Sequence, residues 1–215
     1  MAQPATKGTS VQLSALIVAA GEARRFGQPK QLLPWGRNNT ILGSVLATVK
    51  KTPGLARIHV VLGAHYDAIT KTMESALSTV NVIRNRAWQQ GMFSSITEGL
   101  RFLSNDATNE GILVLLGDMP FITPEILSQF VGAAETLTQE QPLIIATVHD
   151  RPAHPYLLWQ HHIGEILSLS GETGIRPFIQ KHFAQAHAIN VSRHSGRQDI
   201  DTWETYKQLF KESLA

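Results

Sequence analysis

Small residues and positive charges follow one another in the segment that leaves the first apolar run of the chain. Ala19, Ala20 and Gly21 carry almost no side chain, so their backbone N–H groups can approach a ligand closely. The cations that follow within seven residues are Arg24, Arg25 and Lys30. Cations beside accessible N–H groups are the natural complement of a triphosphate. The segment predicts a phosphate site, with a solvated basic turn as the alternative.

An acidic residue stands at the tip of a later apolar run, in residues 117–120 (GDMP). The carboxylate of Asp118, at the end of a buried strand, would suit a Mg²⁺ ion that holds phosphate oxygens. An Asx-type turn is the alternative, because an isolated Gly-Asp pair more often means only that.

Two further carboxylates, Asp199 and Asp201, directly precede the last helical pattern of the chain. They could complete a metal site with Asp118. Alternatively, Thr202 is simply the N-cap of that helix, and the acidic residues interact favourably with the helix dipole.

Short β-branched runs alternate with helical patterns along the chain, and they must position these residues. Helices are expected at residues 40–51 and 67–77 and after Thr123-Pro124, and Ser95 to Glu98 has the spacing of a capping box. The alternation predicts an α/β fold with a mostly parallel sheet, whose ligands bind beyond the carboxyl ends of the strands. The predicted strands are residues 13–19, 58–62, 80–83, 112–116, 143–148 and 188–191.

Composition limits the classes of protein that remain. The 215 residues are 43% hydrophobic and 17% charged, which suits one domain (residues 13–215) after a flexible tail (residues 1–12). A net charge of only +2 argues against nucleic acid as a partner. The absence of cysteine excludes disulfides, iron–sulfur clusters and thiol catalysis. The longest apolar run, residues 13–20, is too short to span a membrane, so a cytoplasmic protein is expected.

Six segments, taken in order from about residue 13 to residue 209, resemble the MobA-like NTP transferases of the nucleotidyltransferase superfamily. Within that group the chain is most similar to the molybdenum cofactor cytidylyltransferases. The first segment resembles L-x-A-A-G-x-S-x-R-M-G-x-x-K at Ala19, Ala20, Gly21, Arg25, Gly27 and Lys30. The others are residues 85–96 (NRAWQQGMFSSI), 117–120 (GDMP), 153–155 (AHP), 171–176 (GETGIR) and 199–202 (DIDT).

The resemblance implies a three-layer α/β/α, Rossmann-like fold and assigns roles to individual residues. The nucleotide would bind at Ala19, Ala20, Gly21, Arg25, Lys30, Ser94, Ser95 and Asp118. The implied catalytic residues are Arg25, Lys30 and Asp118, and the implied Mg²⁺ ligands are Asp118 and Asp201. The implied acceptor-binding residues are His154, Glu172 and Arg176.

The reaction implied by the resemblance is in-line attack of an acceptor phosphate on the α-phosphorus of an NTP, which releases pyrophosphate. CTP is the favoured NTP, the acceptor is a molybdopterin-type cofactor, and a molybdenum enzyme is a candidate partner. The alternatives are GTP, a sugar phosphate acceptor, a non-catalytic nucleotide or cofactor carrier, and an α/β domain without a small-molecule site. The chain departs from the family pattern at several positions: Glu22 and Ala23 replace small polar residues, Arg86 replaces Pro, Ala153 replaces Gly and Glu172 replaces Asp. The nucleotide half of the resemblance is therefore better supported than the acceptor half.

Overall fold

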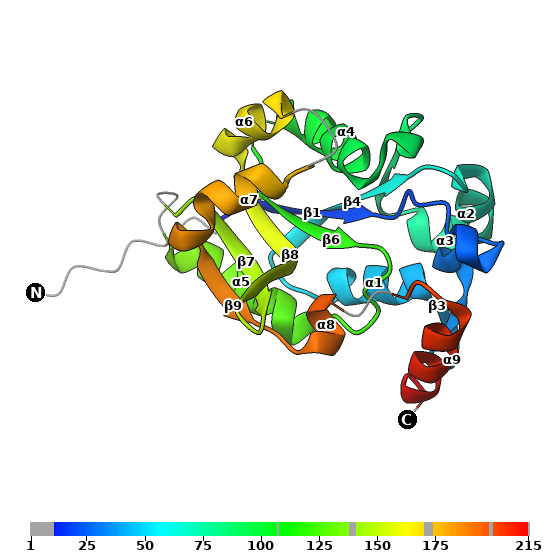
Figure 1. The fold of residues 1–215 in the computed structure, drawn as a ribbon. Helices are drawn as coiled ribbons and strands as arrows, with labels where there is room; N and C mark the ends of the chain where they lie inside the picture. Colours follow the sequence, from blue (N-terminus) through cyan, green and yellow to red (C-terminus); the bar gives the residue numbers. More distant parts are fainter. Residues whose placement is uncertain (1–10, 107, 138–140, 170–173, 198–199, 215) are drawn as a thin grey trace, which may run out of the picture.

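The computed structural model describes residues 11–106, 108–137, 141–169, 174–197 and 200–214. Across these residues a seven-stranded sheet has the order β5-β4-β1-β6-β8-β7-β9 (Figure 1). Its strands are β1 (Leu13–Val18), β4 (Leu55–Leu62), β5 (Asn81–Arg84), β6 (Gly111–Leu116), β7 (Leu143–Val148), β8 (Arg151–Trp159) and β9 (His187–Asn190). A short antiparallel ribbon is formed by β2 (Pro34–Trp35) and β3 (Asn39–Thr40).

The parallel half of the sheet is centred on β1. This strand pairs in parallel with β4 on one side and β6 on the other, and β5 pairs in parallel with β4. Every residue of β1 is buried, because helices cover both faces of the sheet. The six predicted strands are confirmed with small shifts, of which the largest is the earlier start of β4 at Leu55.

The longest strand, β8, was not predicted from the sequence. It runs antiparallel between β6 and β7, so its amino-terminal half lies beside the carboxyl end of β6. Pro152 and Pro155 within it cannot donate to a ladder, and prolines ordinarily argue against a central strand. The pairing of β8 with β7 shifts register between Ile145 and Ala146.

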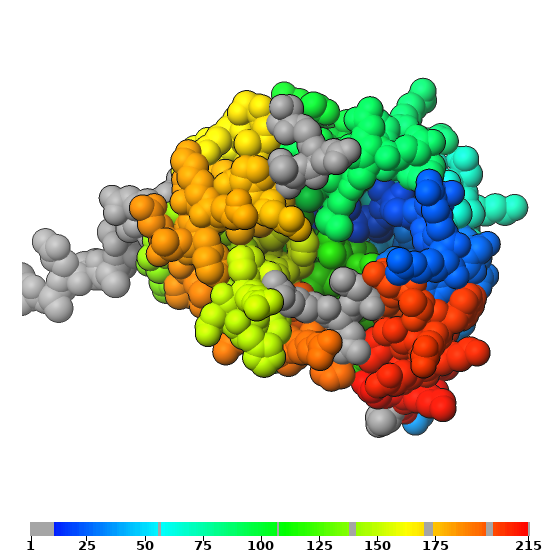
Figure 2. Space-filling model, viewed as in Figure 1, coloured from blue at the N-terminus to red at the C-terminus, as the bar shows by residue number. Residues whose placement is uncertain are grey.

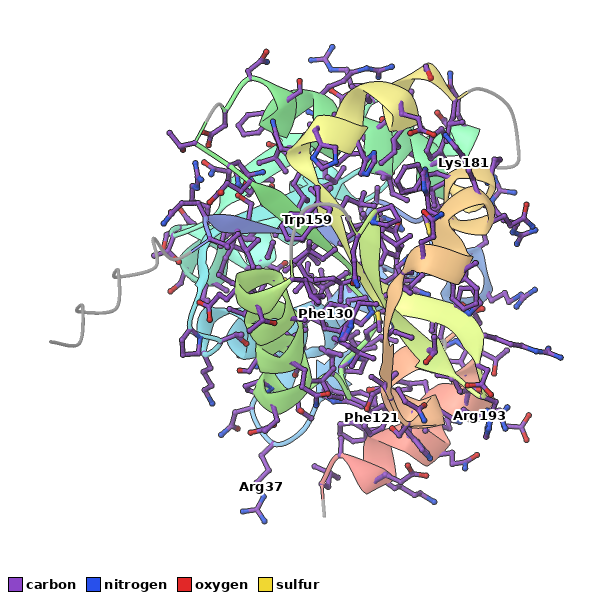
Figure 3. The ribbon with its side chains drawn as sticks, turned by 90° about the vertical axis from the view of Figure 1, so that its left-hand side faces the viewer. Arg37, Phe121, Phe130, Trp159, Lys181 and Arg193 are labelled. Atoms are coloured by element: carbon purple, nitrogen blue, oxygen red, sulfur yellow. The ribbon has the colours of Figure 1, made fainter. Side chains whose placement is uncertain are left out.

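Two groups of helices make the outer layers and confirm the three-layer α/β/α fold (Figure 1). The core on one face contains Phe130 of the helix layer and Trp159 of β8, which Figure 3 shows within the interior. The helices of this layer are α1 (Ile41–Lys50), α2 (Tyr66–Thr72), α3 (Glu74–Leu77) and α5 (Pro124–Thr136). Those of the other layer are α4 (Met92–Ser104), α6 (Ile163–Ser168) and α7 (Arg176–His182).

The predicted helix starts are confirmed at three threonines and wrong at the capping box. The side chains of Thr40, Thr123 and Thr202 each accept a hydrogen bond from the third N–H that follows. Helix α4 instead begins at Met92, after Gly91 with φ 96°, so the residues from Ser95 to Glu98 lie inside it. The single helix predicted over residues 67–77 is interrupted at Met73.

The carboxyl-terminal part of the chain returns to the segment that follows β1. After α8 (Arg193–Arg197), helix α9 (Trp203–Glu212) packs Tyr206 and Leu209 against Phe26 and Trp35. The hydroxyl of Tyr206 donates to the carbonyl of Pro34 at 2.9 Å. Within the described ranges, no helix is both long and apolar enough to cross a bilayer.

Candidate active site

A cavity of about 940 Å³ opens at the carboxyl ends of β1 and β6, where the sequence predicts the ligand. It opens on the face seen in Figure 2, between the blue segment after β1 and the orange segment that contains α7. Its walls come from residues 18–24, Lys30 and Gln31, the start of α4, residues 116–119, the start of β8, Arg176, part of α8 and Asp201.

At one side of the cavity the ammonium group of Lys30 lies between two carboxylates. Its Nζ is 2.5 Å from Oδ2 of Asp118 and 3.2 Å from Oδ1 of Asp201, and it also donates to the carbonyl of Ile200 at 3.3 Å. The side chains of Lys30 and Asp118 are only 14% and 19% exposed, whereas that of Asp201 is 54% exposed. Three segments far apart in sequence therefore meet at one charged point.

The electrostatics of this cluster hold Lys30 in its charged form. Burial acts to lower the pKa of Lys30, but the charges and hydrogen bonds of Asp118 and Asp201 outweigh it and raise this pKa above its usual value. One ammonium between two carboxylates leaves one negative charge uncompensated. Carboxylate oxygens are the ligands that Mg²⁺ prefers. The residues therefore fit a divalent cation, once a phosphate draws the ammonium away.

The segment 19–21 forms the wall next to this cluster. The N–H of Ala19 donates to the carbonyl of Val61 at 2.9 Å, which continues the β1–β4 ladder by one residue. The contacts are close: a Cβ at Gly117 would lie 2.6 Å from Cβ of Ala19, and a Cβ at Gly63 would lie 2.7 Å from the carbonyl oxygen of Ala20. The small residues after β1 were predicted to admit a ligand. Together with Gly63 and Gly117 they also let the ends of β1, β4 and β6 approach one another.

The start of α4 forms the wall on the other face of the sheet. The amide of the buried Asn85 donates to the hydroxyls of Ser94 and Ser95, both at 2.9 Å, and its oxygen accepts from the N–H of Ala87. Ser95, one of the residues that the resemblance assigns to the nucleotide, lines the cavity. The hydroxyl of Ser94 is instead directed at the carbonyl of Gly91 at 2.8 Å, where it stabilises the turn into α4.

The two predicted arginines take different positions. Arg25 is exposed and lines a smaller hollow beside the cavity, together with Lys30 and Asp201. The guanidinium of Arg24 pairs with the carboxylate of Glu22 at 2.6 Å. The described geometry therefore places Arg25 at the rim of the charged cluster, while Lys30 occupies its centre.

Two of the predicted acceptor residues, His154 and Arg176, line the same cavity. Arg176 begins α7 and is exposed, whereas Glu172 lies outside the described residues. His154 lines the cavity next to the start of β8, with its ring 4.9 Å from that of Tyr156. Burial lowers the pKa of His154 to about 4, although the charge of Asp118 acts in the opposite direction. Near neutral pH His154 is uncharged, so it can form hydrogen bonds but cannot neutralise a phosphate.

Several residues of the site were not assigned a role from the sequence. His194, Ser195 and Gly196 of α8 line the cavity together with His154 and Arg176. The side chains of Gln31 and Asn85 are buried and polar, and both donate hydrogen bonds to residues that line the cavity. A polar residue inside an apolar segment is the signal that could have revealed Gln31 in residues 30–35 (KQLLPW).

A family model described as the MobA-like NTP transferase domain matches residues 15–187, most of the chain. The chain belongs to this family. The match covers Lys30 and Asp118, and it ends before Asp201, which completes the charged cluster in the structure, and before α9.

Proteins similar to this MobA-like NTP transferase have differing names. The chain is 26% identical over 210 residues to "Nicotine blue oxidoreductase" of Paenarthrobacter nicotinovorans, covering 92% of this chain and 96% of that protein. It is 22% identical to "Molybdenum cofactor cytidylyltransferase" of Escherichia coli, covering 88% and 91%. Among solved structures, Rv0371c from Mycobacterium tuberculosis superposes with a TM-score of 0.78 at 26% identity, covering 94% and 100%.

Proposed function

We propose that this protein is a Mg²⁺-dependent nucleotidyltransferase that transfers CMP from CTP to the phosphate of a molybdopterin-type acceptor. The observation that carries the proposal is the ammonium of Lys30 held between Asp118 and Asp201 at the wall of the cavity. A phosphate oxygen can take the place of a carboxylate as the partner of this ammonium. The cluster can therefore exchange its internal ion pairs for a triphosphate and a cation together.

Each residue has a defined task in this proposal. Lys30 binds the triphosphate, Arg25 approaches it from the rim, and the N–H groups near Ala20 line the cavity beside it. Asp118 and Asp201 would hold Mg²⁺, and the charge of this ion would neutralise the negative charge of the reacting phosphates. The attacking acceptor phosphate is already ionised near neutral pH, so the step depends on positioning and charge rather than on a protein base.

The acceptor would bind in the half of the cavity lined by His154, Arg176 and α8. Uncharged His154 can hydrogen-bond a polar group of the acceptor, while Arg176 carries a charge suited to its phosphate. The molybdopterin-type acceptor rests on the motif resemblance and on the name of the Escherichia coli relative. We place the reaction in the cytoplasm, with a molybdenum enzyme as the receiver of the product.

Family membership alone does not choose the reaction, because the relative from Paenarthrobacter nicotinovorans is named an oxidoreductase. What favours nucleotidyl transfer here is the charged cluster, since two carboxylates and a lysine suit a metal-bound triphosphate. A non-catalytic carrier would need to bind the nucleotide but would not need to stabilise a reacting phosphate.

A thermal-shift panel of the four NTPs, each with and without Mg²⁺, tests the proposal first. A ligand that binds only the folded state raises Tm, so CTP with Mg²⁺ should give the largest shift. Pyrophosphate release from CTP in the presence of molybdopterin then separates an enzyme from a carrier. A shift with GTP alone would reassign the nucleotide, binding without pyrophosphate release would favour the carrier, and no shift with any NTP would contradict the proposal.

A further inference from the structure

Gln31 is a buried glutamine whose side chain joins two carbonyl groups of the segment that follows β1. Only 2% of the residue is exposed. Its Nε2 donates to the carbonyl of Ala19 at 2.9 Å and to that of Gly21 at 3.1 Å. One amide group therefore fixes two peptide planes, Ala19–Ala20 and Gly21–Glu22, on either side of the Ala20–Gly21 peptide.

These two hydrogen bonds determine the direction of the neighbouring N–H groups. In a trans peptide the C=O of one residue and the N–H of the next point in opposite directions. Because the carbonyls of Ala19 and Gly21 point at Gln31, the N–H groups of Ala20 and Glu22 point away from it, in residues that line the cavity. The carbonyl of Ala20 accepts a hydrogen bond from the N–H of Ala64 at 3.1 Å. This bond fixes the intervening peptide plane, Ala20–Gly21.

Gln31 and Lys30 are neighbours in the same turn of 3₁₀ helix, Lys30–Leu32. The side chain of Lys30 extends to Asp118 and Asp201, while that of Gln31 extends to Ala19 and Gly21. The turn is closed by the N–H of Leu33, which donates to the carbonyl of Lys30 at 3.1 Å. One short element thus sets the spacing between the lysine cation and the N–H groups of the adjacent wall.

The oxygen of the same amide lowers the stability of the fold. Oε1 of Gln31 is buried and has no hydrogen-bond partner within the described part of the chain. A buried acceptor without a partner destabilises a folded protein, whereas an apolar side chain of similar length would avoid that cost. The two donated hydrogen bonds are the compensating feature, and they act on the wall of the cavity.

We propose that Gln31 is a positioning residue that orients the N–H groups of Ala20 and Glu22 toward the phosphates of the bound nucleotide. This inference rests on the proposed function, because it assumes that the cavity binds an NTP. Gln31 acts through the backbone and is expected to affect the nucleotide without affecting the acceptor.

The test compares Gln31→Met with Gln160→Met. Methionine has nearly the length of glutamine and cannot donate, so the first variant removes both hydrogen bonds with little change in volume. Gln160 is a matched control, because its Nε2 also donates to a backbone carbonyl, that of Leu103 at 3.3 Å, and it follows the end of β8 that lies away from the cavity. Tm is measured for both variants, so that loss of stability is separated from loss of binding.

Titration calorimetry with CTP, and separately with GTP, should show a Kd about 10-fold or more weaker for Gln31→Met and unchanged for Gln160→Met. KM for the acceptor should be equal in all three proteins. An unchanged Kd in Gln31→Met, or a weakening equal to that of Gln160→Met, would overturn the proposal.

Hydrogen exchange without nucleotide separates this inference from the proposed function. Amides 20–22 should exchange faster in Gln31→Met than in the wild type and the control variant. If the wild type bound no NTP, the proposed function would fail, while faster exchange confined to Gln31→Met would still show that Gln31 orients this segment. Equal exchange in all three proteins would contradict the orienting role itself.

Discussion

At the scale of single residues, the charged cluster is organised around one cation. Lys30 has two carboxylate partners of unequal exposure, and the nearer of them, Asp118, is the less exposed. In the proposed mechanism the two carboxylates keep the ammonium charged in the free protein. When the nucleotide binds, Asp118 and Asp201 would release the ammonium and bind the metal in its place.

We expect Asp118→Asn to lower kcat of pyrophosphate release by about 100-fold or more while KM for CTP changes little. Asparagine preserves the size of the side chain but removes the charge that would stabilise the reacting phosphates with the metal. Circular dichroism and Tm monitor the fold. Asp67→Asn, at an exposed carboxylate paired only loosely with Arg84 at 3.6 Å, is the control and should keep wild-type activity. Equal rates for Asp118→Asn and the wild type would remove Asp118 from the site.

Lys30→Met should have opposite effects on the two ligands of the proposed cluster. Affinity for CTP should fall by about 10-fold or more, because the cation that meets the phosphates is gone. Affinity for Mn²⁺ without nucleotide should rise, because Asp118 and Asp201 lose the ammonium that neutralises them. Titration calorimetry measures both. Lys50→Met, at a distant lysine that donates to the carbonyl of Ala76, should change neither; parallel losses of both ligands in Lys30→Met would argue against the exchange.

At the scale of elements, the sequence predicts the parallel half of the sheet well and its antiparallel strand poorly. Runs such as residues 112–116 are recognisable because both of their faces are buried. Strand β8 is hidden by Pro152 and Pro155, and its place between β6 and β7 follows from tertiary pairing that no local pattern contains.

The candidate site shows the same division between local and long-range information. The positions of Lys30 and Asp118 at strand ends could be predicted from local sequence. The capping box was wrong because Gly91, with a positive φ, starts α4 earlier, and because Asn85 bonds to the hydroxyls of both serines. Contacts between segments that are distant in sequence, such as those of Gln31 and Asn85, require the fold itself.

Helix α4 crosses β1 at Gly99, where close packing fixes the height of the helix above the sheet. A Cβ at Gly99 would lie 2.5 Å from Cδ1 of the fully buried Leu16. Gly99→Ala should therefore destabilise the protein by about 1–3 kcal/mol, despite the higher helix propensity of alanine. Gly132→Ala in α5 is the control, since a Cβ there meets nothing within 4 Å, and it should stabilise by about 0.5–1 kcal/mol. Urea unfolding measures both, and equal signs would contradict the packing argument.

At the scale of the whole molecule, His154, whose ring nitrogen Nε2 is buried, links the site to stability in acid. Its pKa of about 4 in the folded protein lies below the usual 6.5, so between these pH values the unfolded chain binds a proton that the folded chain does not. Stability should therefore decrease as pH falls from about 6.5 to about 4, by up to about 3 kcal/mol from this residue. Above pH 6.5 the contribution is constant.

Urea unfolding of the wild type and His154→Gln at pH 7.5 and pH 4.5 checks this expectation. The variant should lose less stability on acidification than the wild type, whatever its stability at pH 7.5. His149→Asn is the control, at an exposed histidine whose positive φ asparagine tolerates. On acidification it should lose as much stability as the wild type. The same pH dependence in all three proteins would mean that His154 is protonated as readily in the folded chain as in the unfolded one.

The contact between Ala19 and Gly117 also constrains how such a chain can change over generations. Only one methyl group fits between these two strand ends, because a second Cβ, placed on Gly117, would lie 2.6 Å from that of Ala19. Of the four combinations of alanine and glycine at the two positions, the one with two alanines is sterically blocked. A lineage that moved the methyl from one strand end to the other would have to pass through an intermediate with two glycines, so the order in which the two mutations can be accepted is set by packing.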